Sequence, residues 1–119
     1  MRRSQSLDGA MTSTEYPVLE VAILDVKHGQ AAAFRGAFEV AEPIISSMPG
    51  YGGHELRRCT ENDHRFLLLV WWDTVESHEV GFRRSPGYQE WRRLLHDFYE
   101  PFPTVEHYLL DRGGAAPGP

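Results

Sequence analysis

The sequence predicts an α+β domain of the ferredoxin-like βαββαβ type, in which a four-stranded antiparallel sheet carries helices on one face. Strand-length apolar runs rich in β-branched residues alternate with segments whose apolar residues recur at spacings of three and four. The chain has 119 residues, of which 41% are hydrophobic and 24% charged, the size and balance of one globular domain. No apolar run reaches the roughly 18 to 20 residues that a membrane-spanning helix needs, so we expect no membrane association.

The first half of the domain is expected to form a strand, a helix and a hairpin. Val18–Val26 is a β-branched, apolar run and is predicted to be a strand. Apolar residues at helical spacing then predict an amphipathic helix over Gln30–Ser47, which Pro43 should kink because proline lacks the backbone N–H. Two further strands, Tyr51–Cys59 and Arg65–Trp72, flank a polar turn and complete the hairpin.

The second half is expected to form a broken helix and a last strand. Either Asp73 or Thr74 can cap a short helix, and Asp73 has capping-box spacing to the glutamate three residues later. Ser85, followed by a proline, is a strong start signal for a second helix that runs to about Tyr99. Two prolines end this helix, and Val105–Leu110 forms the fourth strand.

Low apolar periodicity marks the two ends of the chain as flexible tails, residues 1–16 and 113–119, around one domain of residues 17–112. Met11 is an alternative start to Met1. Cys59 is the single cysteine and cannot form an internal disulfide, and no apolar leader follows the N-terminus, so the sequence favours a reducing cytoplasm.

Charge and histidine placement exclude two classes of partner. The net charge is −5, and the arginines are scattered in pairs, whereas a nucleic-acid-binding surface is normally basic. The six histidines show no ligand spacing such as HxxxH, and Cys59 offers no thiolate cluster. We therefore expect neither nucleic acid nor metal.

Four short motifs occur in a characteristic order between Leu19 and Leu110. They are Met48-Pro49-Gly50-Tyr51, Trp71-Trp72, Glu76-Ser77-His78 and Ser85-Pro86-Gly87-Tyr88. Because these motifs occur in this order and with this spacing, the chain resembles the antibiotic biosynthesis monooxygenase family. The resemblance implies a dimeric α+β barrel and points to oxidation of small aromatic substrates by O₂ without a cofactor.

Functional residues of the anthrone-oxidising branch of that family carry over only in part. Trp72 matches a tryptophan of that branch, and Arg92 falls at its arginine. His78 stands where the branch has a tyrosine, while Leu68 replaces an asparagine and Leu56 replaces a second-strand tyrosine.

The functional residues of the haem-degrading branch are matched less well. Its first-strand asparagine, its tryptophan and its axial histidine correspond to Ala22, Gly81 and Trp91. Haem degradation of that type is therefore not expected.

In the cofactor-free mechanism that the resemblance implies, a base deprotonates a phenolic substrate and the carbanion reduces O₂. His78 is the predicted base, because the ordinary pKa of histidine is near neutrality and its spacing from Phe82 turns it toward the sheet. Trp72 is the predicted stacking platform and Arg92 the predicted oxyanion partner. For each of these three residues, a purely structural role in the core or on a solvated face explains the pattern as well.

Several other side chains are expected to line the same pocket. His54 alternates with Leu56 on its strand and would share its face as a second proton carrier, unless it lies near solvent at the strand end. The predicted substrate-binding residues are His54, Leu56, Leu68, Phe82, Tyr88 and Trp91. Helical spacing alone also explains Tyr88 and Trp91 as core residues.

Two alternatives stay open beside the cofactor-free monooxygenase. The apolar replacements at Leu56 and Leu68 favour a non-catalytic dimeric protein that sequesters a small molecule. A haem-binding protein with His54, His78 or His96 as an unconventional ligand is the third reading.

The sheet face opposite the helices is predicted to bury itself in a homodimer. If Leu68 and Trp72 face the helices, as the resemblance implies, the strands stay apolar on their other face as well, whereas a monomer would expose polar side chains there. The predicted interface consists of Leu19, Val21, Ile23, Leu67, Leu69 and Trp71. Their contiguous apolar area exceeds what soluble monomers usually expose.

Overall fold

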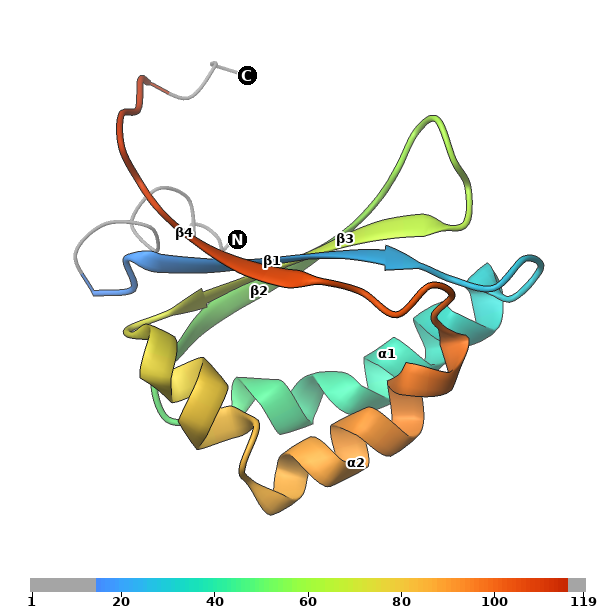
Figure 1. Cartoon of the computed structure of the whole chain (residues 1–119), viewed down its shortest axis with the longest axis horizontal. Helices are drawn as coiled ribbons and strands as arrows, with labels where there is room; N and C mark the ends of the chain where they lie inside the picture. The colour runs from blue at the N-terminus through green and yellow to red at the C-terminus, as the bar shows by residue number, and fades with distance from the viewer. Residues whose placement is uncertain (1–14, 116–119) are drawn as a thin grey trace.

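The structure, a computed structural model that describes residues 15–115, is a sheet with helices on one face (Figure 1). The strands are β1 (Val18–Asp25), β2 (Tyr51–Arg58), β3 (Arg65–Trp72) and β4 (Val105–Leu109). The helices are α1 (Ala31–Ser46), the π-helical turn η2 (Ser77–Phe82), α2 (Pro86–Leu95) and the 3₁₀ turn η3 (His96–Phe98). Most of the two predicted tails, together with Met11, lies outside the described residues.

All four strands pair antiparallel in the order β2-β3-β1-β4, which confirms the predicted ferredoxin-like sheet. β1 therefore lies between β3 and β4, while β2 and β4 are the two edges of the sheet. In this register Glu20 of β1 lies opposite Val70 of β3 and His107 of β4. Residues 20 and 107 thus lie side by side, although 87 positions separate them in the sequence.

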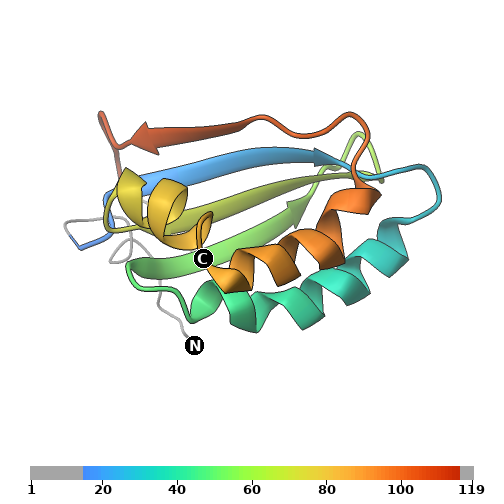
Figure 2. The same ribbon diagram turned by 60° about the horizontal axis from the view of Figure 1, so that its bottom comes forward.

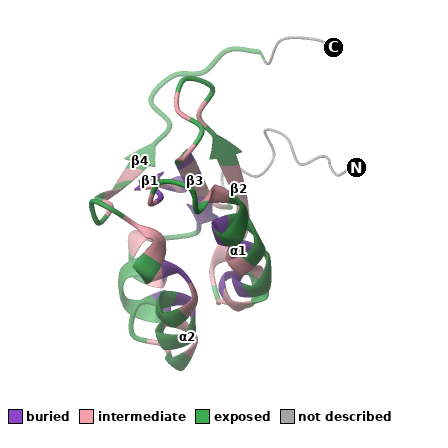
Figure 3. Cartoon of the chain, turned by 90° about the vertical axis from the view of Figure 1, so that its right-hand side faces the viewer, coloured by how far each residue is buried: buried purple, intermediate pink, exposed green. Residues whose placement is uncertain are grey.

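The core fills the space between the sheet and the two long helices, which lie side by side beneath it (Figures 2 and 3). Alternate residues of β1 and β3 point into this space, as the two-residue period of a strand requires. The largest fully buried side chains are Trp72, Phe34, Phe66, Phe82, Leu24, Ile45 and Leu95. A core of this width, built on aromatic rings, leaves irregular space that a cavity can occupy.

The predicted helix starts are largely correct in position. Ser85 caps α2, because its hydroxyl accepts a 3.1 Å hydrogen bond from the N–H of Tyr88. Before η2 it is Thr74 that accepts the N–H of Ser77, whereas Asp73 accepts the Ser77 hydroxyl. α1 continues through Pro43 to Ser46. Within residues 15–115 no helix is both long and apolar enough to cross a bilayer.

The turn into β2 depends on the glycine of the first motif. Gly50 has φ +87°, and a Cβ built there would lie 2.3 Å from Asp73 Oδ1 and 2.5 Å from Ser77 Oγ. Its carbonyl also accepts the N–H of Asp73 at 2.9 Å. The turn therefore holds the start of β2 against the end of β3, with no room for a side chain.

We expect Gly50→Ala to lower the free energy of unfolding by about 2 to 4 kcal/mol, because left-handed backbone strain and the clash add together. Urea denaturation measures the change. Gly36→Ala is the matched control, since Gly36 is inside α1 and nothing lies within 4 Å of an added Cβ. That control should gain about 0.5 to 1 kcal/mol. An equal loss of unfolding free energy in both variants would contradict the conclusion that Asp73 and Ser77 leave no room for a side chain at Gly50.

The sheet face opposite the helices, here called the outer face, is less open than the sequence suggests. Ile23, toward the end of β1, is 51% exposed, whereas Leu19, Val21, Leu67 and Leu69 are half-buried. Trp71, which the sequence places on the exposed interface, is only 8% exposed within the single chain. Part of the predicted surface is therefore covered before any partner binds.

Candidate active site

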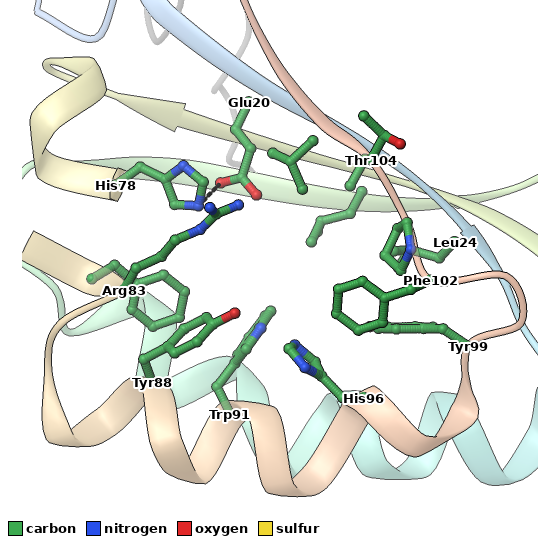
Figure 4. A pocket seen from close by; sticks show the side chains of 15 residues that line it. Glu20, Leu24, His78, Arg83, Tyr88, Trp91, His96, Tyr99, Phe102 and Thr104 are labelled. Atoms are coloured by element: carbon green, nitrogen blue, oxygen red, sulfur yellow. Dashed lines mark ion pairs between the residues drawn. The ribbon is translucent and has the colours of Figure 1, made fainter. Parts of the chain in front are cut away.

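A partly open cavity of about 410 Å³ lies between the β1–β4 half of the sheet and the segment from η2 to the start of β4 (Figure 4). Its walls are formed by Glu20, Ala22, Leu24, Leu68, His78, Phe82, Arg83, Tyr88, Trp91, His96, Tyr99, Phe102, Pro103, Thr104 and Val105. Most of these side chains are aromatic or aliphatic, and Glu20, His78 and Arg83 gather at the η2 end (Figure 4). A flat apolar molecule with one polar group fits such a lining.

Glu20 is the buried carboxyl of the cavity wall. It points toward the helices because it shares its strand face with Val18, Ala22 and Leu24, and it is only 5% exposed. Trp72 Nε1 donates a 2.9 Å hydrogen bond to Glu20 Oε1. Burial raises the pKa of the Glu20 carboxyl from 4.5 to about 7, although the Trp72 hydrogen bond and the charge of Arg83 act in the opposite direction.

His78 lies against Glu20 at the same end of the cavity. Its ring stacks on Trp72 with centroids 5.5 Å apart, and its Nε2 lies 3.4 Å from Glu20 Oε1. Its Nδ1 lies 2.8 Å from Nε2 of His107 on β4. The predicted orientation of His78 toward the sheet is therefore confirmed, since only 2% of the residue is exposed.

This environment does not favour the predicted role of His78 as the base. Burial lowers the pKa of the imidazole from 6.5 to about 3, and the charges of Arg83 and His107 act in the same direction. A group with that pKa is neutral near pH 7 but is too weak a base to hold a substrate proton. Glu20, with a pKa near the working pH, is better matched to proton abstraction.

Arg83 follows η2 and supplies the positive charge of the cavity. Its guanidinium lies near Glu20 and His78 (Figure 4), and it influences the pKa of both groups. Among residues 15–115 no carboxylate lies within ion-pair distance of Arg83. The guanidinium is therefore free to bind an oxyanion in the cavity.

Two of the predicted catalytic residues lie elsewhere. Trp72 is fully buried and does not line the cavity, because its indole packs under Glu20 and His78; it donates a hydrogen bond to Glu20 instead of facing the cavity. Arg92 lies in a shallow outer depression on α2 instead of in the cavity, since it is on the polar flank of that helix. Arg83 takes the position that the sequence assigns to Arg92.

His54 and Leu56 are also absent from the cavity wall. Both lie on β2, which the strand order places at the edge of the sheet away from β4 and therefore away from the cavity. His54 is instead held between the Tyr51 hydroxyl, 2.5 Å from its Nδ1, and Glu42 Oε2, 2.7 Å from its Nε2. This is a local link between β2 and α1.

The remaining predicted substrate-binding residues do line the cavity: Leu68, Phe82, Tyr88 and Trp91. Phe82 contacts both Tyr88 and Trp91 edge to face, with ring centroids 5.1 and 5.5 Å apart. Phe82 and Trp91 belong to the core as well, so one set of rings serves both purposes. Over residues 15–115, no group of three or more His, Cys, Asp or Glu side chains is placed to hold a metal ion.

Sequence reasoning missed Glu20, Arg83, Tyr99 and Phe102. For Glu20 a signal existed, because strand alternation puts this residue on the same face as Val18, Ala22 and Leu24, where a carboxylate is unexpected. Tyr99 and Phe102 had no such signal, since the segment between α2 and β4 has no periodicity.

We expect Trp72→Phe to raise the pKa of Glu20 above about 7, because the substitution removes the indole donor that stabilises the carboxylate. The pH midpoint of a ¹³C-labelled Glu20 carboxyl signal measures the shift. Trp91→Phe serves as the comparison, because Trp91 lines the cavity without a hydrogen bond to Glu20. A midpoint that falls or stays constant in Trp72→Phe would contradict the role of the indole.

The model of the antibiotic biosynthesis monooxygenase family matches residues 17–94. Protein YczJ of Bacillus subtilis is 55% identical over 91 residues, which cover 76% of this chain and 96% of YczJ. A Bordetella bronchiseptica protein named for the same family has a crystal structure that superposes with a TM-score of 0.75 at 34% identity, covering 78% of this chain and 95% of that one. SnoaB, a cofactor-independent oxygenase from Streptomyces nogalater, has the same fold, with a TM-score of 0.62 at 23% identity over 85% of this chain and 97% of SnoaB.

Proposed function

The chain belongs to the antibiotic biosynthesis monooxygenase family, and we propose that it oxidises a small phenolic aromatic substrate with O₂, with Glu20 as the base and without metal or flavin. One observation carries the proposal: a buried carboxyl whose pKa is about 7 lines a partly open cavity of aromatic side chains. The description of SnoaB as a cofactor-independent oxygenase supports the same reaction type. Catalytic groups are commonly found where burial shifts a pKa toward neutrality.

The reaction balances without any other oxidant. Glu20 removes one proton from the carbon beside the phenolic ring, and the carbanion transfers one electron to O₂. Recombination of the two radicals forms a C–O bond, and the peroxide takes up a proton. Loss of the second C–H proton then breaks the O–O bond and leaves a carbonyl and water, so that a CH₂ group and O₂ become C=O and H₂O.

The cavity supplies the rest of what this chemistry needs. Arg83 has no carboxylate partner among residues 15–115 and would hold the phenolate oxygen, which favours the electron-rich form of the substrate. Phe82, Tyr88 and Trp91 would hold the ring and exclude water from the carbanion. His78 and Trp72 act on the substrate only through Glu20.

Oxygen-electrode measurements with an anthrone or a dihydroquinone test the proposal. The expected result is O₂ uptake in a one-to-one ratio with substrate, without added metal or flavin and unchanged by chelators. Tight binding of the aromatic compound without O₂ uptake would replace the proposal with the alternative of a non-catalytic binding protein. A Soret band on addition of hemin, with loss of that band in His96→Ala, would favour the haem-binding alternative, because His96 is the predicted ligand that lies at the cavity mouth.

A further inference from the structure

Three ionisable side chains form a continuous line from the cavity wall toward the edge of the sheet. Glu20 Oε1 lies 3.4 Å from Nε2 of His78, and Nδ1 of the same ring lies 2.8 Å from Nε2 of His107. The two ends are fixed by the sheet itself, because Glu20 and His107 are paired across β1 and β4. His78, from η2, bridges the gap between them.

The outer end of this line leaves the cavity. His107 is half-buried on the edge strand β4, and its chain neighbours Glu106 and Tyr108 are exposed. It does not belong to the cavity wall, to which β4 contributes only Val105. A proton that reaches His107 can therefore enter solvent even when a ligand fills the cavity.

We infer that Glu20, His78 and His107 form a proton relay, through which the proton taken from the substrate leaves the ligand-filled cavity on the side where η2 meets β4. The inference rests on the proposed role of Glu20 as the base. In this scheme His78 and His107 act through Glu20 and are positioning residues.

The tautomers of the two imidazoles differ between the states before and after the proton transfer. When Glu20 is protonated, its O–H faces His78 Nε2, and His78 Nδ1–H donates to His107 Nε2. When Glu20 is ionised, His78 Nε2–H donates to the carboxylate, and His78 Nδ1 accepts from His107 Nε2–H. The first state becomes the second when one proton enters His78 at Nε2, one leaves at Nδ1, and His107 releases one from its own Nδ1.

A concerted transfer of this kind suits the surroundings of His78. Arg83 faces the ring from the end of η2, His107 from β4 and Glu20 from β1, while Trp72 covers one side of the ring. A buried imidazolium beside the Arg83 guanidinium is unfavourable, and the burial that lowers the pKa of His78 has the same effect. Because one proton enters as another leaves, no charged His78 has to persist.

Long-range ¹H–¹⁵N NMR of the full chain tests the relay without substrate. We expect His78 to change from the Nδ1–H to the Nε2–H tautomer as the Glu20 carboxyl ionises, with both signals sharing one pH midpoint. A His78 tautomer that stays constant across that midpoint would overturn the relay. Since no turnover is involved, this result is independent of whether the chain consumes O₂.

A kinetic experiment uses His107→Gln, which keeps a hydrogen-bond donor to His78 but has no second ring nitrogen to pass the proton on. After a rapid pH jump, with a non-oxidisable aromatic compound filling the cavity, infrared detection of the Glu20 carboxyl band should show relaxation slowed by about tenfold or more, with the same amplitude and the same midpoint. Imidazole should restore the fast phase in His107→Ala. Unchanged relaxation in folded His107→Gln would overturn the relay, and if the variant does not fold, the tautomer measurement on the natural chain decides alone.

Discussion

Glu20→Gln is expected to reduce kcat/KM for O₂ uptake by about 10² to 10⁴, the range that a positioned general base usually contributes. Glutamine has the same shape, and its amide oxygen can still accept the 2.9 Å hydrogen bond from Trp72 Nε1. Aromatic binding should therefore survive within about threefold, because the ring-lined part of the cavity is unchanged. Steady-state O₂ uptake and fluorescence titration measure the two quantities.

The pH dependence of the natural chain follows from the sign of the Glu20 shift. The base must be ionised, and burial raises its pKa to about 7. We therefore expect kcat/KM to rise about tenfold for each pH unit up to about 7 and to level off above.

The same shift affects stability in the opposite sense. The folded state holds the Glu20 proton more tightly than the unfolded state, so this group contributes stability at low pH that is lost as pH rises from 4.5 to about 7. His78 acts oppositely, because its lowered pKa makes stability rise with pH from about 3 to 6.5. The two effects offset one another between pH 4.5 and 6.5. Above pH 7, Glu20→Gln should be more stable than the natural chain by up to about 3 kcal/mol.

Glu55→Gln is the control for Glu20→Gln, because Glu55 lies on β2 away from the cavity and pairs with Arg57 on the surface. That variant should keep the activity and the pH profile of the natural chain. The assignment of Glu20 would be lost if Glu20→Gln kept more than about a third of the natural rate at saturating substrate.

The elements of the fold were predictable because their signals are local. Strand Val18–Asp25 and the Ser85 cap follow from alternation, β-branching and helix-start chemistry, none of which depends on distant contacts. The position of the cavity, by contrast, depends on which of the two edge strands, β2 or β4, borders it. His54 of β2 and His107 of β4 both come from edges of the sheet, and local sequence patterns do not show that η2 lies over β4.

The second difference between the sequence-based expectation and the structure concerns the pKa values of His78 and Glu20. The ordinary pKa of histidine made His78 attractive as a base, whereas burial moves the pKa of His78 away from neutrality and that of Glu20 toward it. Burial reverses the expected order of the two groups, because it always disfavours the charged form. A carboxyl on a buried strand face is therefore as strong a candidate for a base as a histidine.

The second large effect is expected on the outer face, where we propose that two copies of the chain associate through their sheets. Ile23, toward the end of β1, is 51% exposed on this face, and half-buried apolar residues of β1 and β3 lie beside it. Tyr108 of β4 pairs with Leu19, is 50% exposed and adds to the exposed apolar surface of this face. Apolar surface buried between two such faces stabilises association by about 25 cal/mol per Å² before the cost of association is subtracted.

Ile23→Glu should therefore convert a dimer at micromolar concentration into a 13.6 kDa monomer, because a charged side chain would replace an exposed apolar one in the contact between the two sheets. Ile23 is a better site than Trp71, whose burial within the chain means that a charge there would unfold the domain. Val40→Glu is the matched control, since Val40 is 63% exposed on α1 and lies far from the outer face. Sedimentation equilibrium distinguishes the outcomes: a monomeric natural chain, or equal dissociation in both variants, would exclude the outer face as the interface.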